Sequence, residues 1–273
     1  MSRTLRMGAV AYDPKVVTIW DGFRRWFTGQ GLDFDYVLYS HYERQVEDLV
    51  AGRVDVAWNS PLAWVRTRRM APAARAVAMR DTDRDLTSVL VVRATSPVRQ
   101  PADLAGAAVG TGALDSPQGT LLPLGLLEGV DVAVRRFEVG VGLHGDHVGG
   151  ERDAARALAA GEVDAACMLD ANHLLFAREG TLPAGGTRVV AQTSPFDHCN
   201  MSVTAGHPLL DRFVALLVAM DYADPAARPL MDLEGLTRWL PGRETGYAAL
   251  EAAVDRVGFY DAEGSVTADG YRP

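Results

Sequence analysis

One short pattern occurs twice in this chain of 273 residues. The first copy, LVAGRVDVA, starts at Leu49, and the second, LAAGEVDAA, starts at Leu158. Both read Leu-x-Ala-Gly-x-Val-Asp-x-Ala. Each copy follows a helical period and leads into an apolar stretch, which predicts a helix closed by a left-handed glycine and then a buried strand. The same construction in each half of the chain predicts two similar lobes.

The segments around both copies alternate between strand and helix patterns. Predicted strands cover residues 5–12, 33–40, 54–59, 87–93, 107–112, 133–139 and 163–169, with amphipathic helices such as 16–31, 42–52 and 151–161 between them. This alternation predicts an α/β fold with largely parallel sheets. Ligands of such sheets bind outside the carboxyl ends of the strands. The polar residues after the two repeat strands, in WNSP and MLDANH, are therefore predicted to face one shared cleft.

Composition and charge exclude several classes of partner. The formal net charge is −8 at pH 7, whereas a nucleic-acid-binding face is basic, so no nucleic-acid partner is predicted. The apolar runs fall short of the ~20 residues of a membrane span, so no membrane insertion is expected. The start, MSRTLRMGAVAYDP, has no signal-peptide core and no lipid-anchor cysteine, which predicts a cytoplasmic location. Cys167 and Cys199 are expected to be free thiols.

Three segments carry a resemblance to a known family: YERQVEDLVAGRVDVAWNSPLAWV, DSPQGTLLP and ERDAARALAAGEVDAACMLD. In their order and spacing, the chain from about Leu5 to Thr204 resembles the phosphonate/phosphite-type substrate-binding proteins of ABC transporters. The resemblance implies a type 2 periplasmic-binding-protein fold, in which two crossing strands join two α/β lobes and a ligand lies in the cleft between them. It places the crossing strands near 87–93 and 189–204, lobe 1 at 1–92 plus 200–273, and lobe 2 at 93–199.

The resemblance also implies site residues. Tyr42 matches a ligand-facing tyrosine, Trp64 an aromatic after a turn, and Ser116-Pro117-Gln118-Gly119 a turn that cradles the anion. An acidic ligand for a substrate amine falls near Asp170 or Asn172, and Glu151 lies closer than His147 to the register of a cleft histidine. With the residues chosen for their chemistry, the predicted ligand contacts are Tyr42, Asn59, Trp64, Ser116, Gln118, Gly119, His147, Asp170, Asn172 and His198.

The stretch PFDHCN, on the returning crossing strand, supports an alternative. A cytosolic enzyme on the same fold could use His198 and Cys199 as catalytic residues, with or without a metal. Adjacent strand residues point to opposite faces, so His147 or Asp170 is predicted to be the better partner for either one. His41, His147, Asp170, His198 and Cys199 are suitable metal ligands but lack a diagnostic spacing, so no metal site is predicted.

The sequence therefore predicts a protein that binds a small anionic or zwitterionic metabolite bearing a phosphate, phosphonate or carboxylate. A cytosolic enzyme is the first alternative and a cytosolic sensor the second. An ABC permease is a predicted partner only if an export signal precedes this sequence. Whether the chain catalyses a reaction, which cofactor it uses and which ligand it binds stay open.

Overall fold

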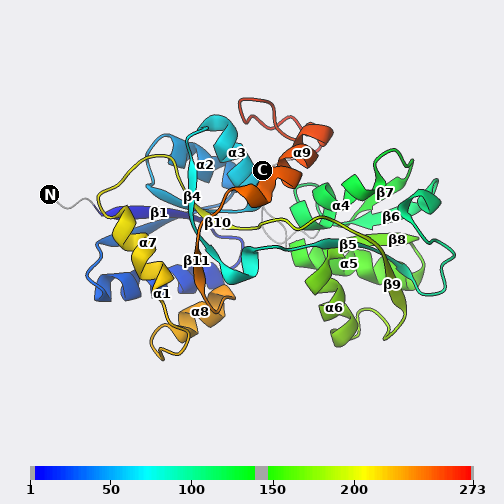
Figure 1. The fold of residues 1–273 in the computed structure, drawn as a ribbon, viewed down its shortest axis with the longest axis horizontal. Helices are drawn as coiled ribbons and strands as arrows, with labels where there is room; N and C mark the ends of the chain where they lie inside the picture. The colour runs from blue at the N-terminus through cyan, green and yellow to red at the C-terminus, as the bar shows by residue number, and fades with distance from the viewer. Residues whose placement is uncertain (1–3, 139–146, 272–273) are drawn as a thin grey trace.

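The computed structural model describes residues 4–138 and 147–271, with the backbone alone described at residues 147–149. Two α/β lobes lie side by side along the long axis of the molecule (Figure 1). The two-lobed α/β architecture expected from the repeat is confirmed. In the described part of the chain, no helix combines the length and the apolar character needed to cross a membrane.

The first lobe contains a six-stranded sheet in the order β11-β4-β10-β3-β1-β2. Its strands are β1 (Leu5–Val10), β2 (Phe34–Tyr39), β3 (Val56–Asn59), β4 (Arg75–Arg80), β10 (Asn200–Val203) and β11 (Trp239–Pro241). Its helices are α1 (Lys15–Gly29), α2 (Tyr42–Val50), α3 (Pro61–Met70), α7 (Leu210–Val218), α8 (Arg228–Glu234) and α9 (Ala248–Val257). Helices α2 and α3 lie above the sheet in Figure 1, and α1, α7 and α8 lie below it.

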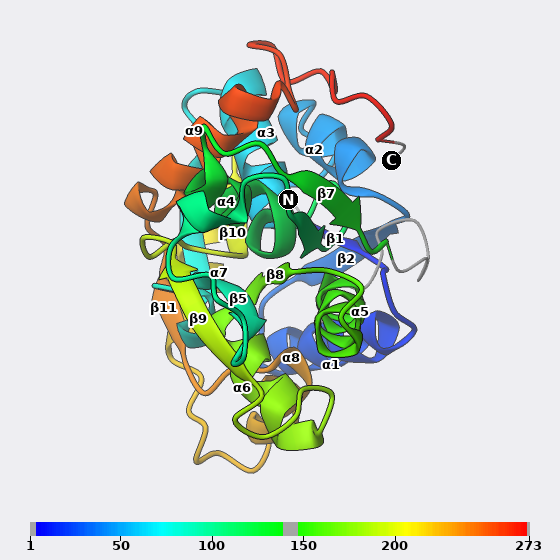
Figure 2. The same cartoon turned by 90° about the vertical axis from the view of Figure 1, so that its right-hand side faces the viewer.

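The second lobe contains a five-stranded sheet in the order β7-β6-β8-β5-β9. Its strands are β5 (Ser88–Arg93), β6 (Ala108–Thr111), β7 (Ala133–Arg136), β8 (Ala165–Leu169) and β9 (Thr187–Gln192). The helical segments are the π-helical turn η3 (Pro117–Leu121), α4 (Leu122–Leu124), α5 (His147–Ala160) and α6 (Asp170–Glu179). Figure 2 shows this lobe towards the viewer, with α5 and α6 on one side of its sheet and α4 on the other.

The repeat has a structural explanation in both lobes. Gly52 and Gly161 have φ of 69° and 78°, the left-handed conformation that closes a helix and favours glycine. The following aspartates each anchor a neighbouring parallel strand at two points. Asp55 accepts from the backbone N–H of Arg6 and donates its own N–H to the Arg6 carbonyl. Asp164 makes the same two bonds with Ala108, so the repeat sets the register of β3 on β1 and of β8 on β6.

The prediction of largely parallel sheets was wrong. The strands around each repeat are parallel, but β10 is antiparallel to both β3 and β4, and β5 is antiparallel to both β8 and β9. The reason is that β5 and β10 enter their sheets from the opposite lobe and run against the local β-α-β direction. Each sheet is therefore mixed.

The crossings between the lobes differ from the expected segments, because the first lies earlier in the chain and the second is shorter than expected. Both β5 and β9 hydrogen-bond within the second sheet, so residues 88–92 lie in that lobe and not in the first. The connecting segments are 81–87 and 193–199, and Leu86 and Phe196 join them through two reciprocal backbone bonds of 2.8 Å. The C-terminal helix α9 adds an apolar contact, because Leu250 and Val254 pack with Leu62 of α3 and with Leu121 of η3.

Candidate functional site

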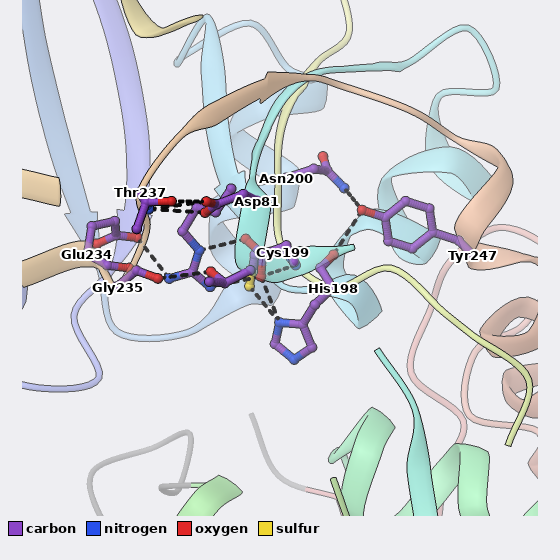
Figure 3. Close-up of polar contacts among 11 residues, drawn as sticks. Asp81, His198, Cys199, Asn200, Glu234, Gly235, Thr237 and Tyr247 are labelled. Carbon is purple, nitrogen blue, oxygen red and sulfur yellow. Dashed lines mark hydrogen bonds and ion pairs between the residues drawn. The ribbon is translucent and has the colours of Figure 1, made fainter. Parts of the chain in front are cut away.

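Residues of both crossing segments, of β4 and of α8 form a polar group on the first lobe, which we call the lobe-1 cluster: Arg80, Asp83, His198, Cys199 and Glu234. Figure 3 labels His198, Cys199 and Glu234 of this cluster. Asp83 lies at its centre and is almost fully buried. Its two carboxylate oxygens accept from Arg80 Nε at 2.6 Å and Arg80 Nη2 at 2.8 Å. The positive charge of Arg80 and bonds from Arg80 and His198 outweigh burial and lower the pKa of Asp83 to about 2.

His198 and Cys199 contact each other, which corrects the prediction that they point to opposite faces. His198 Nδ1 lies 3.1 Å from Cys199 Sγ and 3.5 Å from Asp83 Oδ1. Strand alternation does not apply here because β10 begins only at Asn200. Burial alone would lower the pKa of His198, but the Cys199 sulfur and the Asp83 carboxylate raise it to about 10. His198 is therefore an imidazolium at neutral pH.

The backbone around His198 and Cys199 is fixed by several partners. The N–H of His198 donates to the Asp83 carbonyl at 2.8 Å, and the Tyr247 hydroxyl donates to the His198 carbonyl at 2.9 Å. Figure 3 shows Tyr247 and Asn200 on one side of His198, and the second ring nitrogen of His198 turned away from the Cys199 contact. The N–H of this second nitrogen is the part of the imidazolium that is directed away from the lobe-1 cluster.

Arg80 connects the cluster to the end of α8. Its Nη1 donates to the Glu234 carbonyl at 2.7 Å and lies 3.5 Å from Glu234 Oε1. Burial raises the pKa of Glu234 to about 7, although the charge of Arg80 opposes that rise.

Tyr12 and Tyr42 lie beside the lobe-1 cluster. Burial, Glu234 and Cys199 raise the pKa of Tyr12 to about 12, and burial with Cys199 and Tyr12 raises the pKa of Tyr42 further above its ordinary value.

A second polar group, the lobe-2 cluster, consists of Ser116, Gln118, Gly119, Glu151 and Asn172. Its centre is Glu151, on the second turn of α5 and fully buried. Glu151 Oε2 accepts from the Leu169 N–H at 2.7 Å and from Asn172 Nδ2 at 2.8 Å. A Cβ added at Gly119 would lie 3.0 Å from Glu151 Cγ, so glycine allows the carboxylate to pack against the η3 turn.

The two clusters interact across the boundary between the lobes. Burial raises the pKa of Glu151 to about 7, and hydrogen bonds from Asn172 and Leu169, the nearby Gln118 amide and the positive charge of His198 limit that rise. Such an effect requires the two side chains only to lie near each other. Figure 3 shows the ring of His198 turned from lobe 1 towards the second lobe, to which Glu151 belongs.

Two predicted ligand contacts are internal instead. Asn59 is fully buried, and its amide is used within lobe 1: Oδ1 accepts from Gln45 at 2.8 Å, and Nδ2 donates to Ser202 at 2.9 Å and to Thr67 at 3.1 Å. Trp64 is a core residue whose ring lies 5.7 Å from that of Tyr247. These contacts correct both predictions. Asn59 supports the end of β3, and Trp64 supports the tyrosine that holds His198.

Most of the other predicted contacts belong to one of the two clusters. Tyr42 and His198 lie at the lobe-1 cluster, and Ser116, Gln118, Gly119 and Asn172 at the lobe-2 cluster. Asp170 begins α6, and its N–H donates to the Thr87 carbonyl. His147 begins α5, but its side chain lies outside the described residues.

Sequence reasoning missed Tyr12, Arg80 and Asp83. Tyr12 and Arg80 stand at or just after the carboxyl ends of strands, where ligands are expected.

Asp83, His198 and Cys199 also offer ligand atoms within 4.8 Å of one another, a spacing suited to a metal ion. The carboxylate, however, is already engaged through both oxygens by Arg80. A cation at this position would displace the guanidinium or lie beside its positive charge. The arrangement therefore fits an ordered imidazolium and thiol better than a metal centre.

The two cysteines provide an internal comparison of reactivity. We expect iodoacetamide to alkylate Cys199 at least ~10-fold faster than Cys167. A charged imidazole stands 3.1 Å from the Cys199 sulfur, whereas Cys167 is fully buried and burial raises its pKa to about 12. Peptide mass spectrometry over time measures both alkylation rates in one sample, and His198→Gln should slow the alkylation of Cys199 alone. Equal alkylation rates at the two thiols would contradict an effect of His198 on Cys199.

The fold and the two facing clusters are those of a two-lobed ligand-binding protein. The sequence profile described as the ABC transporter, phosphonate, periplasmic substrate-binding protein family matches residues 10–247, and the chain belongs to this family. The resemblance seen in the sequence is thereby confirmed. No curated protein matches the chain significantly, and the comparisons give no support to the enzyme alternative.

Solved structures share the fold at low sequence identity. PhnD1 from Prochlorococcus marinus, in complex with methylphosphonate, has a TM-score of 0.65 and 16% identity, covering 93% of this chain and 98% of that one. XAC2383 from Xanthomonas citri, bound to ATP, has a TM-score of 0.69 and 18% identity over the same shares. The periplasmic aliphatic sulphonate binding protein SsuA from Escherichia coli has a TM-score of 0.56 and 16% identity, covering 94% of this chain and 87% of that one.

Proposed function

We propose that this protein captures a small anionic or zwitterionic metabolite between its lobes, with the lobe-1 and lobe-2 clusters on opposite sides of the ligand. The observation that carries the proposal is that His198 of lobe 1 is turned towards lobe 2 (Figure 3), where its charge lowers the pKa of the buried Glu151. Two of the similar structures support the ligand class, since one is a complex with methylphosphonate and another is an aliphatic sulphonate binding protein.

Capture would use the crossings as a hinge. Segments 81–87 and 193–199 carry Asp83, His198 and Cys199, so a change in the angle between the lobes moves these residues relative to Glu151. Excluding water between the lobes strengthens each charged contact with the ligand. His198 is suited to the anionic part of the ligand, because its imidazolium has one N–H directed away from the Asp83 and Cys199 contacts.

The family assigns this chain to the substrate-binding component of ABC transporters. We propose that it delivers its ligand to a membrane permease, which requires export. The cytoplasmic location predicted from the N-terminal sequence is the competing proposal, and it would suit a sensor or a cytosolic store. Cell fractionation with an antibody to the untagged protein distinguishes the two locations.

Thermal unfolding with a panel of small anions tests the proposed binding. The panel contains methylphosphonate, ethanesulfonate and propionate, together with their amino derivatives aminomethylphosphonate, taurine and β-alanine. We expect at least one member at ~1,000 times its Kd to stabilise the fold by about 4 kcal/mol, and so to raise Tm by several degrees. A panel in which no member raises Tm contradicts the proposed ligand class.

A further inference from the structure

We propose that the lobe-2 cluster binds the protonated amine of a zwitterionic ligand, so that the cationic end of the ligand, and not its anionic end, lies on the η3 turn. The inference rests on the proposed function and adds the orientation and class of the ligand. It reverses the expectation from the resemblance, in which the turn Ser116–Gly119 cradles an anion.

The first argument is that the turn is already capped. Ser116 Oγ accepts the N–H of Gly119 at 3.0 Å, and the backbone carbonyl of Ser116 accepts the N–H groups of Thr120 and Leu121. A turn that binds an anion presents such N–H groups to the ligand. Here the N–H of Gly119 is taken by the Ser116 cap, and those of Thr120 and Leu121 form the internal bonds of the helical turn.

The second argument is the carboxylate beside the turn. Glu151 Cδ lies 3.5 Å from the position of a Cβ on Gly119, so the negative group occupies the space next to η3. Above pH 7, where Glu151 is ionised, an anionic ligand group placed there would meet a carboxylate of the same sign in a buried setting, which is costly. A protonated amine at the same place would be attracted.

The third argument is the supply of unused acceptors. Among the described residues, none hydrogen-bonds Glu151 Oε1 or Gln118 Oε1, and both atoms are shielded from solvent. The two side chains are 0% and 6% exposed, and a buried acceptor without a donor is costly by about 1–3 kcal/mol. The Gln118 amide lies near enough to Glu151 to lower the pKa of its carboxyl. Two buried acceptors without donors match an ammonium group.

The fourth argument is the charge on the opposite side. His198 of lobe 1 is an imidazolium held by Asp83 and Cys199, and its ring is turned towards lobe 2 (Figure 3), where its charge lowers the pKa of Glu151. A zwitterion lying between them meets a positive group on lobe 1 and a negative group on lobe 2. The same molecule in the opposite orientation meets like charges at both ends.

Calorimetric titration of matched pairs tests the inference with the intact protein. The pairs are methylphosphonate with aminomethylphosphonate, ethanesulfonate with taurine, and propionate with β-alanine, so each pair differs by one ammonium. In any pair that binds, we expect the amino member to bind at least ~10-fold tighter. Glu151→Gln should reduce the preference to below ~3-fold, and Gln118→Met, which removes only the second acceptor, should reduce it in part. The control Glu179→Gln, a lobe-2 carboxylate paired with Arg152, should keep the full preference.

The outcomes separate this inference from the proposed function. Equal binding within the pairs, or a preference that survives both Glu151→Gln and Gln118→Met, overturns the inference and leaves the proposed function standing. No binding by any member contradicts the proposed function, and the inference falls with it. Circular dichroism of each variant without ligand shows that a lost preference is not lost folding.

Discussion

Replacing Asp83 with alanine is expected to destabilise the protein by about 3 kcal/mol, because it leaves a partly buried guanidinium and an imidazolium without their counter-charge. The Asp83 carboxylate binds Arg80 through both oxygens and accepts the N–H of Cys199 at 3.2 Å. A loss of this size is a large fraction of the stability of an ordinary domain. Urea unfolding of the variant measures it as a shift of the midpoint.

Asp85→Asn is the matched control for this effect. Asp85 lies two residues further along the same crossing segment and pairs with Arg243, but its side chain is 66% exposed. Exposed ion pairs contribute about 0–1 kcal/mol, so the control should stay close to the parent protein. A similar loss for Asp83→Ala and Asp85→Asn would show that Asp83 does not organise the lobe-1 cluster.

Stability should fall by roughly 2 kcal/mol for each of two buried carboxyls between pH 5 and pH 8. Burial raises the pKa of Glu151 and of Glu234 from 4.5 to about 7 in the folded protein. In this range the unfolded chain releases both protons, whereas the folded chain keeps them until the pH passes about 7. The contribution of each group is therefore complete below pH 4.5 and is lost as the pH rises through 7.

Urea unfolding at pH 5 and pH 8 measures this loss for the parent protein and for Glu151→Gln and Glu234→Gln. Each variant should lose less stability than the parent over the same range, since its amide does not titrate. His198 steepens the decline in all three proteins, because its raised pKa of about 10 also makes the folded state hold a proton that the unfolded state releases. Stability that is constant or rises from pH 5 to pH 8 would contradict the burial of these carboxyls.

The sequence was sufficient to predict the fold class and the similar construction of the lobes. The repeat was the strongest signal, because its glycine and aspartate have the same local roles in both copies: Gly52 and Gly161 close helices, and Asp55 and Asp164 anchor neighbouring strands. The strand directions were not predictable from local pattern. The hydrophobic period of β5 and β10 is the same whether they run parallel or antiparallel to their neighbours, and only the crossing between lobes decides it.

The members of the two clusters were predicted in part. The resemblance pointed to Tyr42 and Gln118, and the polar stretch PFDHCN on a crossing strand pointed to His198. Asn59 occupies an equally suggestive place, yet its amide is satisfied by Gln45 and Ser202, residues whose proximity depends on tertiary packing. Asp83 lies in a short polar stretch, DTDRD, that has no local signature. Its importance arises only when the second crossing returns beside it.

The central claim is that one ligand is held by residues of both lobes. Calorimetric titration of the tightest-binding panel member tests this claim most directly, with His198→Ala as the lobe-1 variant, Glu151→Gln as the lobe-2 variant and Glu179→Gln as the control. Each of the first two substitutions should weaken binding at least ~10-fold, and the control should not. Binding that is unchanged by His198→Ala and by Glu151→Gln would place the ligand elsewhere and contradict the account.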